Sequence, residues 1–271
     1  MTRIFALCAD RRAALAATFA ALLFGCPLLV AQEMLRGVDL AQPAYSASEL
    51  SRDDVKAKLA ALKEGETLDL AGLSLNGLDL SGLDLSRANL RAARLVKARL
   101  AGARLDKAAL DQAWLLEADL TGASLRGASL FAAQLQRVRA DGADFSYARI
   151  AGDLTAASLR GAKFVEADLS ADMKNQSMGL MRAVLRQAVL EGASFVSADL
   201  MRADLRYAHA AGADFSGAAL QGADAAGADF SGANWDGAKT QGLDLDSARI
   251  DAAAAAGPLR DALGLDRAVK Q

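Results

Sequence analysis

Residues 198–207 read ADLMR-ADLRY, which is one five-residue unit written twice. The unit continues in both directions, because a leucine stands at every fifth position from Leu70 to Leu135 and the same spacing continues through Phe145 to Ile150. Two positions before each of these residues lies a small or apolar one, and the other three positions are mostly charged, Ser, Asn or Gly. We therefore expect two inward-facing and three solvent-facing positions in every unit.

A strict period of five fits neither of the common regular structures. Five steps of about 100° smear the apolar positions around a helix axis. Five is also odd, so an alternating strand would swap its faces at every repeat. A chain that turns a corner once per repeat satisfies both conditions.

The units ADLMR at 198–202 and ADLRY at 203–207 resemble the pentapeptide repeat family, whose consensus is small-Asp/Asn-Leu-polar-polar. The resemblance implies an all-β solenoid over residues 66–250, a right-handed quadrilateral parallel β-helix. It implies about nine coils of four pentapeptides, in which backbone hydrogen bonds join coils that cannot stand alone.

Such a stack needs protected ends. The sequence offers residues 32–65 as a linker and capping helix, in which Ser51 to Asp54 form a capping box and Val55, Leu59 and Leu62 share one face up to Gly65. At the other end, residues 251–271 are expected to form a second cap. There Pro258 is expected to open a short helix that carries Leu259, Leu263 and Val269.

Residues 1–31 have the pattern of a bacterial export signal, with arginines at 3, 11 and 12 before an uncharged run from Ala13 to Ala31. We expect cleavage after Ala31 and a periplasmic or secreted protein. Two alternatives stay open, a lipoprotein in which Cys26 is lipidated and a retained membrane anchor. Membrane contact is expected only through such an N-terminus. Both cysteines, Cys8 and Cys26, lie in this segment, so the body has no thiol chemistry.

The repeat loses its register twice. Leu154 follows Ile150 one residue early, and Leu180 follows Leu169 one residue late, across residues 170–179 that lack the repeat. This stretch is expected to bulge or loop from the solenoid, either as a tolerated insertion or as the main partner-facing irregularity. The candidate contact residues are Met173, Lys174, Asn175, Gln176, Met178, Met181 and Met201, of which the last two share a column on adjacent coils.

Twenty-residue spacing also stacks charges. Oppositely charged residues alternate in the column Asp79, Arg99, Asp119 and Arg139. A like-charged column holds Asp204, Asp224 and Asp244, with Arg202 and Arg206 expected to flank only its first member. These aspartates are either hydrated turn residues or a site for a cation or a basic partner.

Charge also differs along the repeat. Residues 86–110 hold seven basic residues and one acidic residue, whereas residues 191–257 hold ten acidic and four basic ones. This asymmetry favours a preferred docking orientation or association of copies through their ends, and it is equally consistent with sequence drift on a solvated surface.

Enzymatic chemistry is not expected. The only histidine, His209, has no carboxylate or nucleophile beside it in the sequence, the glycines fit no phosphate-binding loop, and no cofactor or metal site is indicated. A net charge of −2 argues against a nucleic-acid partner.

We therefore expect an exported, non-enzymatic scaffold that contacts an unidentified protein partner at the cell envelope or outside the cell. A second hypothesis is a DNA mimic that binds a topoisomerase, because the resemblance implies that some relatives protect DNA gyrase. The export signal and the basic early coils oppose it. A third is an enzyme or cation-binding surface that uses the stacked aspartates.

Overall fold

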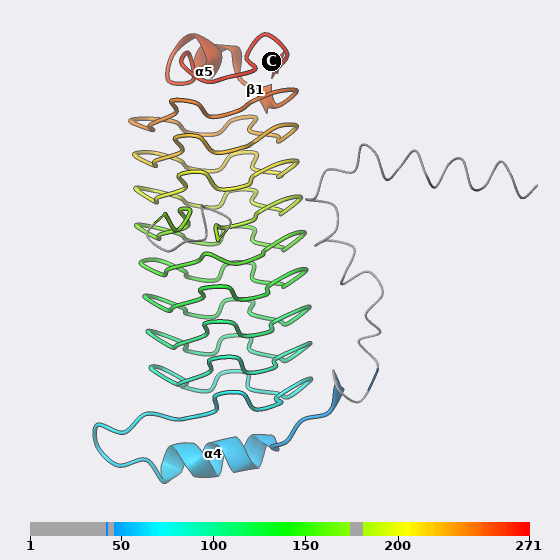
Figure 1. Ribbon diagram of the computed structural model, residues 1–271, viewed down its shortest axis with the longest axis vertical. Coiled ribbons are helices and arrows are strands. Elements are labelled where there is room, and N and C mark those ends of the chain that lie inside the picture. Colours follow the sequence, from blue (N-terminus) through cyan, green and yellow to red (C-terminus); the bar gives the residue numbers. More distant parts are fainter. Residues whose placement is uncertain (1–41, 43–45, 174–180) are drawn as a thin grey trace, which may run out of the picture. The chain divides into compact units, whose positions relative to one another are not determined.

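The computed structural model describes residue 42, residues 46–173 and residues 181–271, and the stacked coils belong to the unit Pro43–Gln271. Its regular elements are the helix α4 (Arg52–Ala60), the strand β1 (Arg249–Ile250), the helix α5 (Ala252–Ala256) and the strand β2 (Val269–Lys270). Between α4 and β1 the chain runs through stacked coils (Figure 1). The export segment 1–31, with Cys26, lies outside the described residues.

Parallel β-bridges join each coil to the next. In the first coil, Asp69, Ser74, Asp79 and Asp84 pair with residues twenty positions later. Because these four positions are five residues apart and each partner lies twenty residues later, each coil has four sides, as the family resemblance implies. The ladder uses backbone hydrogen bonds such as Leu80 N to Arg99 O at 2.7 Å, and most of the pairing occurs as isolated bridges because the chain turns after each one.

Two of the four sides are defined by the residues of their columns. Face A is the side whose inward residues include Leu110, Leu130, Leu169 and Leu200. Face B is the side whose outward bridge residues include Val184, Asp204, Asp224 and Asp244. Residues on one face recur at the twenty-residue spacing, so positions far apart in sequence become neighbours on adjacent coils.

The corner of each repeat lies two residues after the inward leucine. Glycine occupies many of these corners, for example Gly82 with φ +66°, and sixteen described non-glycine residues also adopt positive φ there, including Arg87 with φ +63°. A left-handed conformation costs an L-residue about 1–2 kcal/mol. The stacked coils must therefore outweigh a strain that is repeated along the chain.

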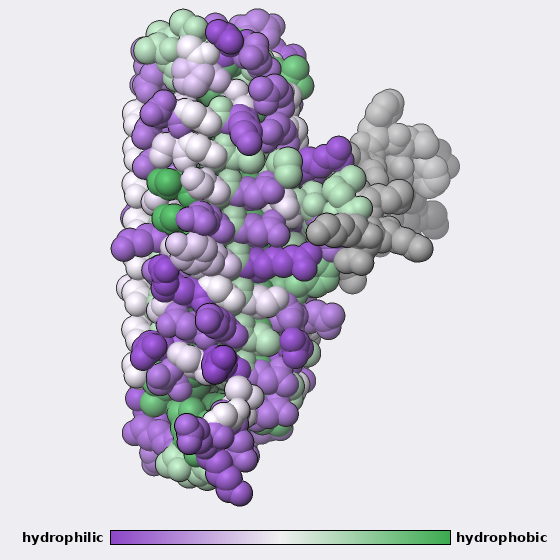
Figure 2. All heavy atoms as spheres, turned by 90° about the vertical axis from the view of Figure 1, so that its left-hand side faces the viewer, coloured by the Kyte–Doolittle hydropathy of each residue, from purple (hydrophilic) through white to green (hydrophobic). Residues whose placement is uncertain are grey.

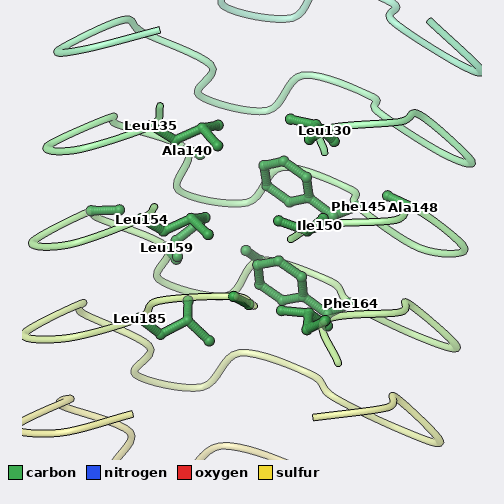
Figure 3. Packing of buried hydrophobic residues seen from close by; sticks show 14 of the residues in the cluster. Leu130, Leu135, Ala140, Phe145, Ala148, Ile150, Leu154, Leu159, Phe164 and Leu185 are labelled. Atoms are coloured by element: carbon green, nitrogen blue, oxygen red, sulfur yellow. The ribbon is translucent and has the colours of Figure 1, made fainter. Parts of the chain in front are cut away.

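The core consists of two inward positions per repeat, and the inward leucines and the alanines two residues before them are almost completely buried. Figure 3 shows Leu130, Leu135, Leu154 and Leu159 pointing into the solenoid beside Phe145. An aromatic column runs along one inner edge, which the sequence analysis did not predict. Its successive rings have centroids 4.7–5.0 Å apart, and its members are Phe145, Phe164, Phe195, Phe215 and Trp235.

The predicted capping box at the start of α4 is confirmed, because Ser51 and Asp54 satisfy each other's backbone N–H groups. Val55 is fully buried, and Leu59 and Leu62 pack against the core. The helix ends at Ala60, earlier than predicted.

The prediction for the C-terminal segment was wrong in one respect. The helix is α5, which lies before Pro258 in a run of alanines, and not after it. Leu259 is buried, but Leu263 and Val269 are more than half exposed. These two residues do not share a helix face because they continue the ladder, Leu263 pairing with Asp244 and Val269 with Arg249.

The first predicted loss of register is confirmed, because Gln134 pairs with Asp153 at a spacing of nineteen residues. The second is also confirmed, since one extra residue in the five-residue period and an irregular stretch at 170–179 were predicted. Asp153 pairs with Val184, so this coil takes thirty-one residues where twenty are usual. Eleven residues are therefore inserted after Leu169, too many to be absorbed as one bulged repeat. Leu180 lies outside the described residues.

Candidate functional site

The insertion leaves the solenoid from face A. Leu169 still donates its N–H to Asp199 O at 2.7 Å, and Ala171 N donates to Met201 O at 3.0 Å. Asp172 N then donates to Met181 O at 2.8 Å. The two ends of the insertion are thus held together by a backbone hydrogen bond. Its predicted contact residues Lys174, Asn175, Gln176 and Met178 lie outside the described residues.

Methionines gather at the base of the insertion. Met173 is 55% exposed and Met201 is 39% exposed, while Met181 is half-buried. Arg202 Nη1 donates to Met173 Sδ at 3.6 Å, which places Met173 against the coil that carries Met201. The structure therefore brings the described members of the predicted set to one region, and unbranched, polarisable side chains there form an adaptable apolar surface.

A buried carboxylate fixes this base. The side chain of Asp172 is only 2% exposed, and Arg149 Nη2 lies 3.4 Å from its Oδ2. The guanidinium of Arg149 also lies over the ring of Phe131, 5.2 Å from the centroid. Sequence reasoning missed this anchor because Asp172 lies outside the repeat and its partner comes from the preceding coil.

The predicted acidic column exists on face B, where Asp204 pairs with Asp224 and Asp224 with Asp244. Asp204 is almost completely buried. Its Oδ2 lies 3.1 Å from Arg186 Nη2 and 3.7 Å from Arg182 Nη2, and it also contacts Arg206.

Two expectations about this column were wrong. Asp204 is not a hydrated turn residue, because the side chains of Arg182, Arg186 and Arg206 cover it. Arg206 also contacts the second aspartate of the column, since its Nε lies 3.2 Å from Asp224 Oδ2. Arg202 is directed to Met173 instead. A signal was available, because Arg186 and Arg206 are twenty residues apart and therefore adjacent on face B.

The two aspartates differ in acidity. Burial acts to raise the pKa of Asp204, but the hydrogen bond from Arg206 and the charges of Arg206 and Arg186 outweigh it, so that the pKa is lowered. Burial raises the pKa of Asp224, and the backbone N–H of Ala226 and the charge of Arg206 do not fully offset it. The arginines thus stabilise the charged form of Asp204, whereas burial destabilises the charged form of Asp224.

The alternating charge column is confirmed as two ion pairs, Arg99 with Asp79 at 3.0 Å and Arg139 with Asp119 at 3.2 Å. Several other basic residues of the early coils also face carboxylates, for example Arg91 with Asp111 and Lys97 with Glu117. The local excess of positive charge is therefore partly compensated. Figure 2 shows hydrophilic side chains over much of one long face, with hydrophobic ones in small separate groups.

Within the described ranges, no group of three or more His, Cys, Asp or Glu residues is placed to hold a metal ion. His209 is exposed in a bridge position between Val189 and Asp229. No helix in the part of the chain that the structure describes has the length and apolar character needed to cross a membrane.

Comparison with known proteins agrees with the repeat. A family model described as pentapeptide repeats matches eight copies that together cover residues 69–146 and 180–250, more than half of the chain. No curated protein matches the chain.

Three solved structures illustrate the similarity. A trypsin-treated form of QnrB1, a plasmid-mediated fluoroquinolone resistance protein, is 21% identical, with 68% of this chain and 84% of that chain covered and a TM-score of 0.45. HetL from the cyanobacterium Nostoc sp. strain PCC 7120, described as involved in heterocyst differentiation regulation, is 26% identical over 73% of this chain and 98% of its own, with a TM-score of 0.27. A pentapeptide repeat protein of the Arabidopsis thaliana thylakoid lumen is 30% identical over 40% and 72%, with a TM-score of 0.30.

Proposed function

Because this chain belongs to the pentapeptide repeat family, whose members form right-handed quadrilateral β-helices, we propose that it is an exported, non-enzymatic scaffold that contacts a protein partner. The observation that carries the proposal is the insertion on face A. A regular solenoid presents nearly the same surface on every coil, whereas the base of the insertion presents exposed Met173 and Met201 beside Arg202. Irregular segments on a rigid scaffold are where binding function concentrates.

The chemistry of the surface also supports contact over catalysis. On face B, arginines pair with the carboxylate of Asp204, and one of them, Arg206, also pairs with Asp224. The Asp204 carboxylate held in this way stabilises the coils, and both carboxylates are poorly placed to act as a general base or as cation ligands.

As part of the same proposal, α4 and residues 251–271 cap the two ends of a stack of about nine coils. The buried Val55 and Leu259 support this role, because each places an apolar side chain against a terminal part of the core. Covering the terminal coils protects backbone groups that otherwise invite edge-to-edge association.

Export to the periplasm or the exterior is proposed from residues 1–31. Cell fractionation, together with mass spectrometry of the mature N-terminus, tests it. A chain beginning at Gln32 in the periplasm or medium supports cleavage. A lipid-modified Cys26 or a full-length membrane-bound chain selects one of the two alternatives, and an unprocessed cytoplasmic chain contradicts export.

The partner is best sought by crosslinking in cells of the source organism, comparing the natural protein with a variant in which two glycines replace residues 174–180. The hydrogen bond between Asp172 N and Met181 O indicates that so short a linker can close the gap. A matched variant carries Tyr147→Ser, which changes an exposed side chain at a corner of the solenoid outside the insertion. We expect the loop variant alone to lose its crosslinked partners, and an unchanged set of partners would contradict the proposal.

The DNA-mimic hypothesis has less support. A mimic needs a continuous negative surface, but face B alternates Asp204 and Asp224 with Arg186 and Arg206, and the early coils are rich in arginine. Purified DNA gyrase provides the test, because inhibition of supercoiling at nanomolar to micromolar protein would favour this hypothesis over an exported scaffold.

A further inference from the structure

A hollow of about 430 Å³ lies on face A and is lined by Arg91, Asp111, Gln112, Ser129, Phe131 and Arg149. These residues come from consecutive coils, and Arg149 also contacts Asp172 at the base of the insertion. The hollow therefore adjoins the proposed contact surface. Its size falls within the range of about 300–1,000 Å³ that is usual for small-ligand sites.

The carboxylate in the hollow is already occupied. Asp111 Oδ1 accepts hydrogen bonds from Phe131 N at 3.1 Å and from Ser129 Oγ. Asp111 Oδ2 accepts from Arg91 Nε at 3.2 Å. Asp111 thus orients Arg91 and has little capacity left to attract a cationic ligand.

The two arginines retain hydrogen-bonding capacity. Among the described residues, the side chain of Arg91 donates only from Nε, and it is 61% exposed. Arg149 donates from Nη2 to Asp172, its Nε lies 3.9 Å from Asp168 Oδ2, and its side chain is 50% exposed. Each guanidinium carries five N–H donors, so both retain donors of the kind that bind carboxylates in pairs.

The hollow also contains an aromatic ring. The half-buried ring of Phe131 lies beneath the guanidinium of Arg149, which holds the cation in place and adds an apolar wall. The hollow therefore combines two arginines, one neutral amide from Gln112 and one ring, with its own carboxylate already engaged.

We propose that this hollow binds an acidic peptide segment in which a carboxylate side chain lies next to an apolar or aromatic one. The carboxylate contacts Arg91 and Arg149, and the apolar neighbour lies against Phe131. A long polyanion such as a nucleic acid is disfavoured, because residues 191–257 of the same chain carry a net charge of −6. The inference rests on the proposed contact function, since it names the chemistry of a partner for that surface.

Isothermal titration calorimetry with purified protein tests the site directly and needs no knowledge of the natural partner. The probes are the capped peptides acetyl-FEFE-amide and acetyl-FQFQ-amide, together with N-acetylglutamate as a free carboxylate and a short single-stranded DNA as a polyanion. We expect binding of the first peptide only, weakened by salt. Equal binding of the glutamine peptide, tighter binding of DNA, or no binding at millimolar peptide would overturn the inference.

Variants locate the site. Arg91→Gln is expected to weaken the peptide affinity by about tenfold, or about 1.4 kcal/mol, since it removes a charge-assisted hydrogen bond. Arg149→Gln is expected to weaken the peptide affinity by at least as much. It also leaves Asp172 without this cation, so circular dichroism checks that the variant folds.

The matched control is Arg139→Gln, an exposed arginine with one aspartate partner on another face. An equal loss in the control would contradict the site. Loss of the cellular partner without loss of peptide binding would separate the two proposals.

Discussion

A Cβ atom on Gly152 would lie 2.6 Å from the carbonyl oxygen of Ala133 on the preceding coil. The contact occurs where the coil has nineteen residues, because the missing residue draws the two backbones together. Gly152 does not have the positive φ of the corner glycines. It is therefore required for close approach, whereas Gly142 occupies a corner with open space around it.

Gly152→Ala is expected to destabilise the protein by about 1–3 kcal/mol or more, because the added methyl group forces the two coils apart. Urea denaturation measures this. The control, Gly142→Ala, adds the same methyl group at a corner with φ +67° and nothing within 4 Å, so it is expected to cost only about 1 kcal/mol. Equal effects of the two substitutions would show that close approach is not the constraint at Gly152.

Asp204→Asn is expected to destabilise the protein by about 3–5 kcal/mol, because it removes the carboxylate that compensates Arg182, Arg186 and Arg206 in a buried position. Chemical denaturation at pH 7 provides the measurement. Asp84→Asn is the control, since Asp84 occupies an equivalent outward position but is exposed and has Arg104 as its only ion-pair partner among the described residues. A control effect as large as that of Asp204 would argue against the arginine cluster as the cause.

The pH dependence of these two face-B aspartates is expected to have opposite signs. The pKa of Asp204 is lowered, so its stabilising contribution is complete above the ordinary value of 3.8 and is lost as the pH falls further. The pKa of Asp224 is raised, chiefly by burial, so its contribution is complete below 3.8 and is lost as the pH rises through the raised value.

Asp224→Asn is consequently expected to raise the melting temperature at pH 7 and to have a vanishing effect below pH 3.8. Thermal unfolding followed by circular dichroism across pH 3–7 compares it with Asp204→Asn, whose penalty should shrink in acid. A lower melting temperature for Asp224→Asn at neutral pH would show that its ion pair with Arg206 outweighs the burial of its charge.

Phe195→Ala is expected to cost about 3–5 kcal/mol, because its ring lies between Phe164 at 4.7 Å and Phe215 at 5.0 Å and the core cannot close around the cavity. Phe195→Leu is expected to cost much less, since leucine fills the same column in earlier coils. Guanidinium denaturation measures both. Similar losses for the two variants would indicate that ring stacking, and not filled volume, stabilises the column.

Ser51→Ala removes the side-chain half of the capping box and is expected to cost about 1 kcal/mol. Val55→Ala removes a fully buried contact with the solenoid and tests the packing of α4 separately. Differential scanning calorimetry compares the two with Lys56→Ala, an exposed change on the same helix. If both changes are silent, α4 does not protect the first coil.

Much of the fold follows from the position of residues in the repeat. Residues such as Leu120 and Ala118 face inward because a unit of five that turns once per repeat has only two interior positions. The capping box at Ser51 and the short register at Leu154 were predicted for similarly local reasons. The C-terminal helix was misplaced, because Pro258 was weighed as a helix start while the ladder pairing of Leu263 and Val269 was not considered.

The candidate site was less predictable. Met181 and Met201 could be assigned to one region because they are twenty residues apart and the repeat predicts which coils are adjacent. The contact between Arg149 and Asp172 could not, since the insertion breaks the periodicity that makes neighbours readable. The hollow beside Phe131 was also missed, because it depends on the directions of long side chains from different coils.

The amino-acid sequence alone determined that the chain turns once in every five residues around two inward positions, because the spacing of inward side chains is a local, repeated property. The four sides of each coil were implied by the resemblance to the pentapeptide repeat family. Only the tertiary structure decided that Arg149 binds the buried Asp172, that three arginines bury Asp204, and that Gly152 must lack a side chain. Each of these depends on how closely particular coils approach and on which side chains meet across them, and periodicity does not specify such distances.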